Sequence, residues 1–135
     1  MDATFVSGPS FAFDYTPASA VTAGQVIVQL GLVGCAKSDI AANRKGALHT
    51  GGIWAFAAED SHAAIPVGTD IFWDDDGNPQ GGTAGDGCAT TTDTGVFLGK
   101  AVPKHDDVAS ADASAASEAT VNVVMLVPEG NAEAS

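Results

Sequence analysis

The sequence predicts a small all-β domain, a β-sandwich or barrel of about seven to eight short strands with long loops. Three observations lead to this fold class. The apolar segments are short and rich in β-branched residues, Gly-rich turns separate them, and no segment has the periodicity of a long helix. The length of 135 residues fits a single domain, and strands do not alternate with helices as they do in α/β folds.

The first strands are predicted in the N-terminal half of the chain. Residues 25–30 are apolar and β-branched, and they follow the turn signal of residues 22–24. Residues 32–36 predict a second strand, which continues the first through a bulge. Residues 38–46 are expected to form a connection anchored by Ile40, because they end in an Asn-to-Gly loop pattern.

Four more strands are predicted after this connection. Residues 53–57 alternate large and small apolar side chains, so both faces of that strand are apolar. Residues 69–73 predict a strand that stops at the strong turn signal of residues 74–79. Residues 96–102 and 120–127 are rich in Val and predict two further strands.

Segments without apolar periodicity predict the loops and the ends of the domain. Residues 77–95 are rich in Gly and Thr and residues 103–118 in Ala and Ser, so we expect two long surface loops there. We expect residues 1–13 to be an extended N-terminal arm, residues 14–128 the single β domain, and residues 129–135 a flexible C-terminal tail.

The charge of the chain argues against two classes of partner. Five basic residues face 17 acidic residues, so the net charge is -12. Such a chain repels phosphate backbones and anionic lipids, and we expect no nucleic-acid partner and no membrane partner. Most of the excess lies in residues 68–135, which we expect to form an outward acidic coat. The N-terminus has no basic segment followed by a long apolar one, so we expect synthesis in a cytoplasm without a secretory signal.

No motif in the sequence predicts catalysis. Asp74-Asp75-Asp76 is suited to a calcium ion, but Pro79 and Gly85 stand where an EF-hand loop has Gly and Glu. A looser cation site at that turn stays open. His105 beside Asp106 has no candidate nucleophile near it, so we expect no enzymatic activity and no cofactor.

Lys100 and the two cysteines are expected to have structural roles. The setting of Lys100 is similar to that of the modified lysine in biotinyl and lipoyl domains, which lies at a hairpin tip. Here the flanking Val and Leu residues predict an outward-facing lysine inside a strand. Cys35 is predicted to be a buried thiol and Cys88 a loop thiol, because neither has a Cys or His at zinc-ligand spacing.

Five aromatic residues are the candidate interaction residues: Phe5, Phe11, Phe13, Trp54 and Phe56. Two roles are open for Trp54 and Phe56. They fill the core of a chain that is poor in Leu, or they anchor an interface with another subunit or partner. The three phenylalanines of the N-terminal arm are suited to adding an apolar strand to a neighbouring subunit or surface.

Nine short segments follow one another in an order that is informative as a set: Asp14-Tyr15-Thr16-Pro17, Val21 with Ala23–Val28, Leu32–Ala36, Asp39–Ala41, Gly46–Leu48, Gly52–Trp54, Val67–Asp74, Gly99–Val102 and Ala119–Val123. In this order they resemble the DUF2190 family of tailed-phage and prophage proteins, over roughly residues 14 to 127. After Trp54 the chain has Ala55-Phe56-Ala57 where that family usually has a Pro-Lys pair. The two loops are also longer than is typical of the family.

The resemblance implies a capsid cement or decoration protein, a small β-rich domain on the outer surface of a phage head. Members of that family are commonly trimers and brace neighbouring major capsid protein subunits. The resemblance therefore implies a virion protein whose partners are the major capsid protein and its own copies, and it implies no catalytic residues. An acidic β domain fits this role, because it resists aggregation and does not bind packaged DNA.

The alternative from another functional class is a free-standing ligand-binding module. A carbohydrate-binding β-sandwich would use Trp54 or Trp73 as a platform for a sugar ring. Glycan binding without affinity for capsids would favour this alternative.

Overall fold

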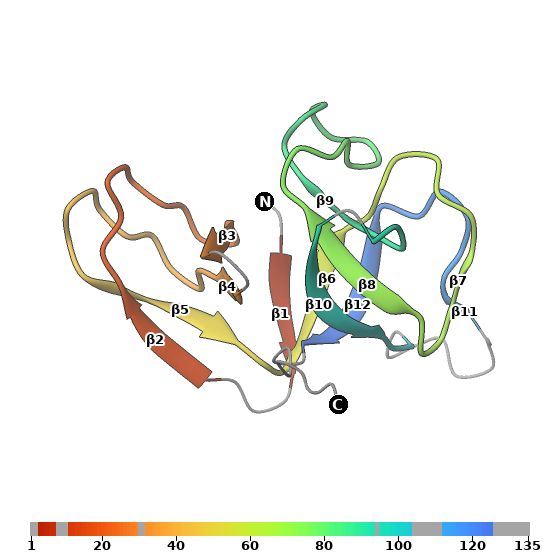
Figure 1. Ribbon diagram of the computed structural model, residues 1–135, viewed down its shortest axis with the longest axis horizontal. Helices are drawn as coiled ribbons and strands as arrows, with labels where there is room; N and C mark the ends of the chain where they lie inside the picture. Colours follow the sequence, from red (N-terminus) through yellow and green to blue (C-terminus); the bar gives the residue numbers. More distant parts are fainter. Residues whose placement is uncertain (1–2, 8–10, 30–31, 94, 104–111, 126–135) are drawn as a thin grey trace.

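The computed structural model describes residues 3–7, 11–29, 32–93, 95–103 and 112–125. These residues form twelve β-strands and no helix, which confirms the predicted all-β class. The strands pair in antiparallel fashion in three sheets, and no sheet closes into a barrel. The fold is therefore sandwich-like (Figure 1).

The six-stranded and two-stranded sheets combine strands from distant parts of the sequence, whereas the four-stranded sheet comes from residues 11–50. The six-stranded sheet has the order β1 (Ala3–Ser7), β6 (Ile53–Ala57), β12 (Thr120–Met125), β10 (Val96–Ala101), β8 (Asp70–Asp74), β9 (Cys88–Thr90). The four-stranded sheet has the order β2 (Phe11–Tyr15), β5 (Gly46–Thr50), β4 (Leu32–Cys35), β3 (Val26–Gln29). The smallest sheet pairs β11 (Asp112–Ser114) with β7 (Ile65–Pro66).

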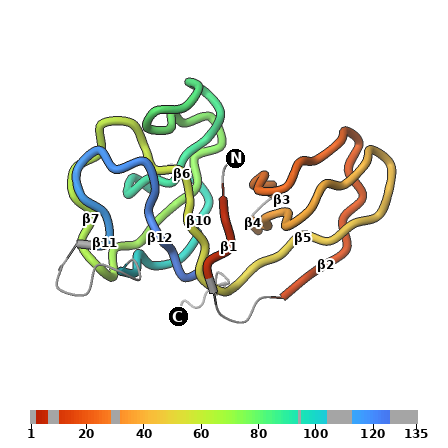
Figure 2. Tube along the Cα trace, turned by 180° about the vertical axis from the view of Figure 1, so that it is seen from behind, coloured from red at the N-terminus to blue at the C-terminus, as the bar shows by residue number. Residues whose placement is uncertain are grey.

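Strand β1 is the edge of the six-stranded sheet that lies nearest the four-stranded sheet, as the views from both sides show (Figures 1 and 2). The Ala3 backbone N–H at its start donates to the Gly24 carbonyl at 2.8 Å, on the side of the four-stranded sheet. The chain crosses directly from β5 to β6 through Gly51 and Gly52, whose φ angles are 82° and 75°. Only glycine adopts this left-handed region without strain, so the pair makes a tight crossing between the sheets.

The main core contains the inner face of the six-stranded sheet. Trp54 and Phe56 point into it from alternate positions of β6, and Val123 and Val121 lie opposite them on β12. The four-stranded sheet contributes to the same core, which further includes Val26, Val33, Cys35, Ile71, Trp73 and Leu98. Removing this apolar surface from water is the main source of stability, and it joins the two sheets.

The opposite face of the four-stranded sheet carries a second, smaller apolar cluster. Its buried members are Val21, Ala36, Ile40 and Leu48, and Phe13, Tyr15 and Ile27 pack against them. Val21 and Ile40 exchange two backbone hydrogen bonds of 2.8 Å, which fix the loops that cover this face. The predicted anchoring role of Ile40 is confirmed.

The structure has more strands than the sequence predicted. One of the additional strands is β5, for which the sequence analysis assigned no strand, and the others are of two kinds. Strands β7, β9 and β11 have only two or three residues, too few for a periodic pattern to be visible. The stretch predicted as an N-terminal arm contributes β1, which pairs with β6, and much of β2, which pairs with β5.

The prediction of a loop thiol at Cys88 is wrong. Cys88 is buried at the start of β9, within the stretch 77–95 that was expected to be a loop. The reason is that the preceding turn folds back over β8, where Gly87 lies against the Trp73 indole. The buried position of Cys35 is confirmed. The predicted tail at 129–135 lies outside the described residues.

Candidate interaction surface

Trp54 and Phe56 are covered by the chain itself. Their exposed fractions are 1% and 0%, and the Trp54 indole N–H donates to the Gly51 carbonyl at 2.9 Å. Of the two roles that the sequence left open, this burial supports the role in the core. Trp73 is equally buried, so neither tryptophan presents a ring face to a sugar.

Phe5 stands at the boundary between the core and the surface. Its ring meets Trp54 edge-on, with the ring centroids 5.2 Å apart, and the Lys37 ammonium lies 4.0 Å from the Phe5 centroid. A cation over an aromatic face is attracted by the ring quadrupole. Lys37 therefore ties the loop after β4 to β1 at the junction of the two sheets.

The aromatic side chains of β2 follow the alternation of the strand. Phe13 and Tyr15 pack against the second apolar cluster, and Phe11 is at the same parity on the strand, so it shares their face. Phe11 is nevertheless 70% exposed, because no described residue covers that end of the face. Among the described residues, Phe11 and Val67 are the two exposed large apolar side chains, and Val67 is less exposed, at 43%.

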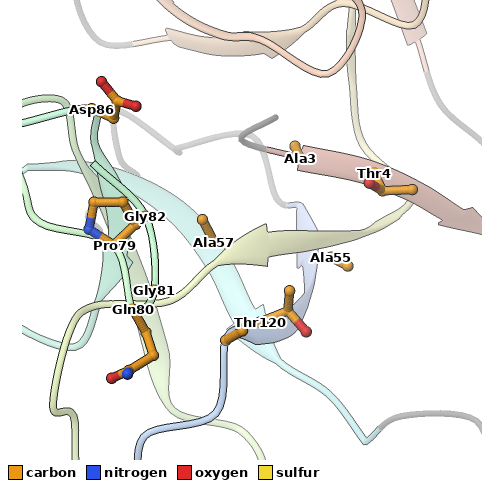
Figure 3. A pocket seen from close by; sticks show the side chains of 11 residues that line it. Ala3, Thr4, Ala55, Ala57, Pro79, Gln80, Gly81, Gly82, Asp86 and Thr120 are labelled. Atoms are coloured by element: carbon orange, nitrogen blue, oxygen red, sulfur yellow. The ribbon is translucent and has the colours of Figure 1, made fainter. Parts of the chain in front are cut away.

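The six-stranded sheet carries a hollow of about 290 Å³ on the side of β1, β6 and β12 (Figure 3). Ala55 and Ala57 of β6 form part of its floor, and the loop from Pro79 to Gly82 stands opposite Ala3 and Thr4. Its lining also includes Asp86, Ala119 and Thr120. This hollow could not be predicted from the sequence, because its lining residues are mostly small and uncharged and form no chemical motif.

Charge is distributed unequally between two regions. Residues 11–50, the small-sheet region, contain two acidic and three basic residues: Asp14, Asp39, Lys37, Arg44 and Lys45. The described residues from 51 to 125, the large-sheet region, contain ten acidic residues and one base, Lys100. The predicted acidic coat thus belongs to the large-sheet region.

The titratable groups of the described residues do not assemble into a reactive centre. No three His, Cys, Asp or Glu side chains gather there as ligands for a metal ion. In the acidic turn, Asp74 accepts from the Asp76 backbone N–H and Asp75 from the Trp73 indole N–H, both at 3.2 Å, so these two carboxylates shape the turn. Lys100 is exposed in β10 and pairs with Asp70, as expected of an outward strand lysine. His105 lies outside the described residues.

Burial changes the titration of two side chains. It raises the pKa of the Cys88 thiol to about 11, and the nearby Glu59 and Asp74 carboxylates add to the effect. It also lowers the pKa of His49, and the positive charge of Lys37 lowers it further. Both side chains are therefore held in their neutral forms near neutral pH.

A comparison with protein families matches residues 7–125 to the phage cement protein family. The chain belongs to this family. No curated protein and no solved structure matches it. The suspected cement or decoration family is thereby confirmed, and the match covers every described strand except most of β1.

Membership makes this a structural phage protein that associates with the capsid as part of the virion. Phage cement proteins are generally not enzymes. The matched range includes Phe11 and most residues around the hollow, whereas Ala3 and Thr4 precede it. In the described part of the chain, no helix is long and apolar enough to cross a membrane.

Proposed function

We propose that this protein decorates the outer surface of a tailed-phage head, where it binds the major capsid protein and braces neighbouring subunits. The observation that carries the proposal is the family match over residues 7–125. The exposure of Phe11 on a domain whose other aromatic side chains are at least half covered supports it, because an exposed ring is a typical interface anchor.

Within this proposal the predicted aromatic residues have unequal roles. Phe11 anchors the contact with a neighbouring copy on the head, and the half-buried Phe13 on the same face of β2 extends the contact area. Phe5 lies apart from them, on β1 against Trp54. Trp54 and Phe56 support the surface from below, since Trp54 packs directly against Phe5. We also propose that the copies on the head form homotrimers.

Weak contacts are sufficient for such a role when many copies act together. A ligand that binds only one state of a shell stabilises that state by mass action, and several linked contacts raise the effective affinity. Bracing of the head therefore does not require a large interface on each copy. It requires a surface that is free on the isolated domain, and Phe11 meets this requirement.

Add-back to phage heads that lack the protein tests the proposal. Wild-type protein is expected to add density on the outer surface in cryo-electron microscopy and to raise the temperature at which the heads rupture. Phe11→Ser is expected to bind about tenfold more weakly, which is the usual size of a moderate interface anchor. Val67→Ser is the matched control, because Val67 is the other exposed large apolar residue of the described chain.

Heads that gain no outer density and rupture at an unchanged temperature would contradict the proposed function. Deletion of residues 1–13 is a poorer test, because β1 is paired with β6 and its loss would uncover the core. Binding of glycans by the isolated protein, without binding to heads, would favour the ligand-binding alternative.

A further inference from the structure

Strand β2 presents a free edge. It is the terminal strand of the four-stranded sheet, and its partner in that sheet is β5. On the other side of β2 no strand of the described chain pairs with it. Unpaired edges that carry apolar side chains associate readily with other chains, and Phe11 lies at the start of this edge.

The hollow lies in the other region of the molecule. It is lined by β1, β6, the loop of residues 79–86 and the start of β12, and no residue of β2 contributes to it. Its volume of about 290 Å³ is larger than a phenyl ring, and four of its eleven lining residues are alanines. The described chain thus carries one largely uncovered aromatic side chain and, elsewhere, a hollow that could receive a ring (Figure 3). A second hollow, of about 350 Å³, has the base Lys37 in its lining and no acidic residue.

The charges of the two regions favour contact between the small-sheet region of one copy and the large-sheet region of another. Two large-sheet regions would repel each other, because each has ten acidic residues against one base among its described residues. The small-sheet region instead has three basic residues against two acidic ones. Complementary potential of this kind favours unlike regions over like regions and fixes the orientation of the contact.

We propose that Phe11 of one copy inserts into the hollow of a second copy in a head-to-tail contact. A contact between two different surfaces of the same chain is heterologous, and it closes into a ring when the rotation between copies permits. The inference rests on the proposed function in one respect: it names the surfaces through which neighbouring copies on a head meet.

Two variants separate the two halves of the contact. Phe11→Ser removes the ring, and Ala119→Arg fills the hollow with a long side chain at an exposed position. Each is expected to weaken self-association at least about tenfold in sedimentation velocity, because each removes an anchor or its pocket. Val67→Ser and Ala116→Arg are matched controls, since both positions are exposed and lie outside the hollow, and they are expected to associate like the wild type.

A mixture of the two defective variants gives the decisive result. Phe11→Ser keeps an intact hollow and Ala119→Arg keeps an intact ring, so a head-to-tail contact predicts one-to-one heterodimers that grow no further. A contact of β2 with β2 would instead be broken only by Phe11→Ser, and that outcome overturns the proposal.

Two other outcomes also overturn it: a wild type that sediments as a monomer up to about 100 µM, and a mixture that stays monomeric. Either outcome is distinguishable from failure of the proposed function. Wild-type protein that is monomeric in solution but raises the rupture temperature of heads would leave the decoration role intact and refute only the contact between copies.

Discussion

At the scale of single residues, the surroundings of the Cys88 thiol hold it in an unreactive state. Cys88 is buried beside Thr90, whose hydroxyl donates to the Glu59 carboxylate at 2.9 Å. A negative charge and a low-polarity environment both oppose formation of a thiolate. A virion protein must persist outside the reducing cytoplasm, and a thiol protected in this way resists oxidation.

The reactivity of Cys88 is the residue-scale prediction. Because the pKa is raised from 9.0 to about 11, the thiolate fraction at pH 8 is lower by roughly 100-fold, and alkylation by iodoacetamide slows by at least that factor. Mass spectrometry of the Cys88 peptide measures the rate, and the chain in denaturant is the control. Fast labelling of the folded chain would refute the prediction.

The same shift has a consequence for stability. The folded thiol keeps its proton to a higher pH than the unfolded thiol, so its contribution is complete below pH 9.0 and is lost as the pH rises toward about 11. The free energy of unfolding of Cys88→Ala is therefore expected to fall less than that of the wild type over this pH range.

At the scale of elements, the longer strands were predictable and the short ones were not. Residues 53–57, 96–102 and 120–127 carry enough β-branched or alternating residues to be recognised, and the structure has β6, β10 and β12 there. Strand β9 is defined by its contacts with β8, and nothing in Cys-Ala-Thr indicates it. Phe11 was among the predicted interaction residues, but the hollow was not predictable, since tertiary packing alone places residues 79–86 near Ala55.

The turn before β9 folds back over β8, and its tight packing against Trp73 leads to a prediction about stability. Gly87 has φ +101°, and a Cβ there would lie 2.8 Å from Cζ2 of Trp73. Gly87→Ala is expected to lower the free energy of unfolding by about 2–5 kcal/mol, the sum of the cost of a left-handed alanine and the cost of an overpacked core. Chemical denaturation measures the change.

Gly81→Ala is the matched control for this substitution. Gly81 also has a positive φ, +74°, but a Cβ there would meet nothing within 4 Å. Its cost is expected to be limited to the backbone term of about 1–2 kcal/mol. Equal losses for the two variants would show that contact with Trp73 is unimportant.

At the scale of the whole molecule, the concentration of acidic residues in the large-sheet region lowers the stability of the isolated domain. The acidic residues of the large-sheet region repel one another, and salt screens this repulsion. We expect the melting temperature to rise by several degrees between about 10 mM and 150 mM NaCl, as the screening length falls from roughly 30 to 8 Å. Differential scanning calorimetry measures this rise.

A variant with fewer acids tests the origin of the salt effect. Asp76→Asn combined with Asp93→Asn removes two exposed charges of the large-sheet region. The double variant is expected to melt higher at low salt and to respond less to added NaCl. An unchanged response to salt would mean that self-repulsion is not its cause.

The position of β12 determines when the protein can fold during its synthesis. This strand lies inside the six-stranded sheet between β6 and β10, although it is the last described strand in the sequence. The four-stranded sheet comes entirely from residues 11–50, so its strands are available early. Strand β6 can pair early with β1, but its second partner, β12, follows about 60 residues later. A chain that ends before residue 120 lacks β12. Its large sheet is therefore split in two, and β6 and β10 become open edges. We therefore expect chains that end before residue 120 to be unable to complete the six-stranded sheet.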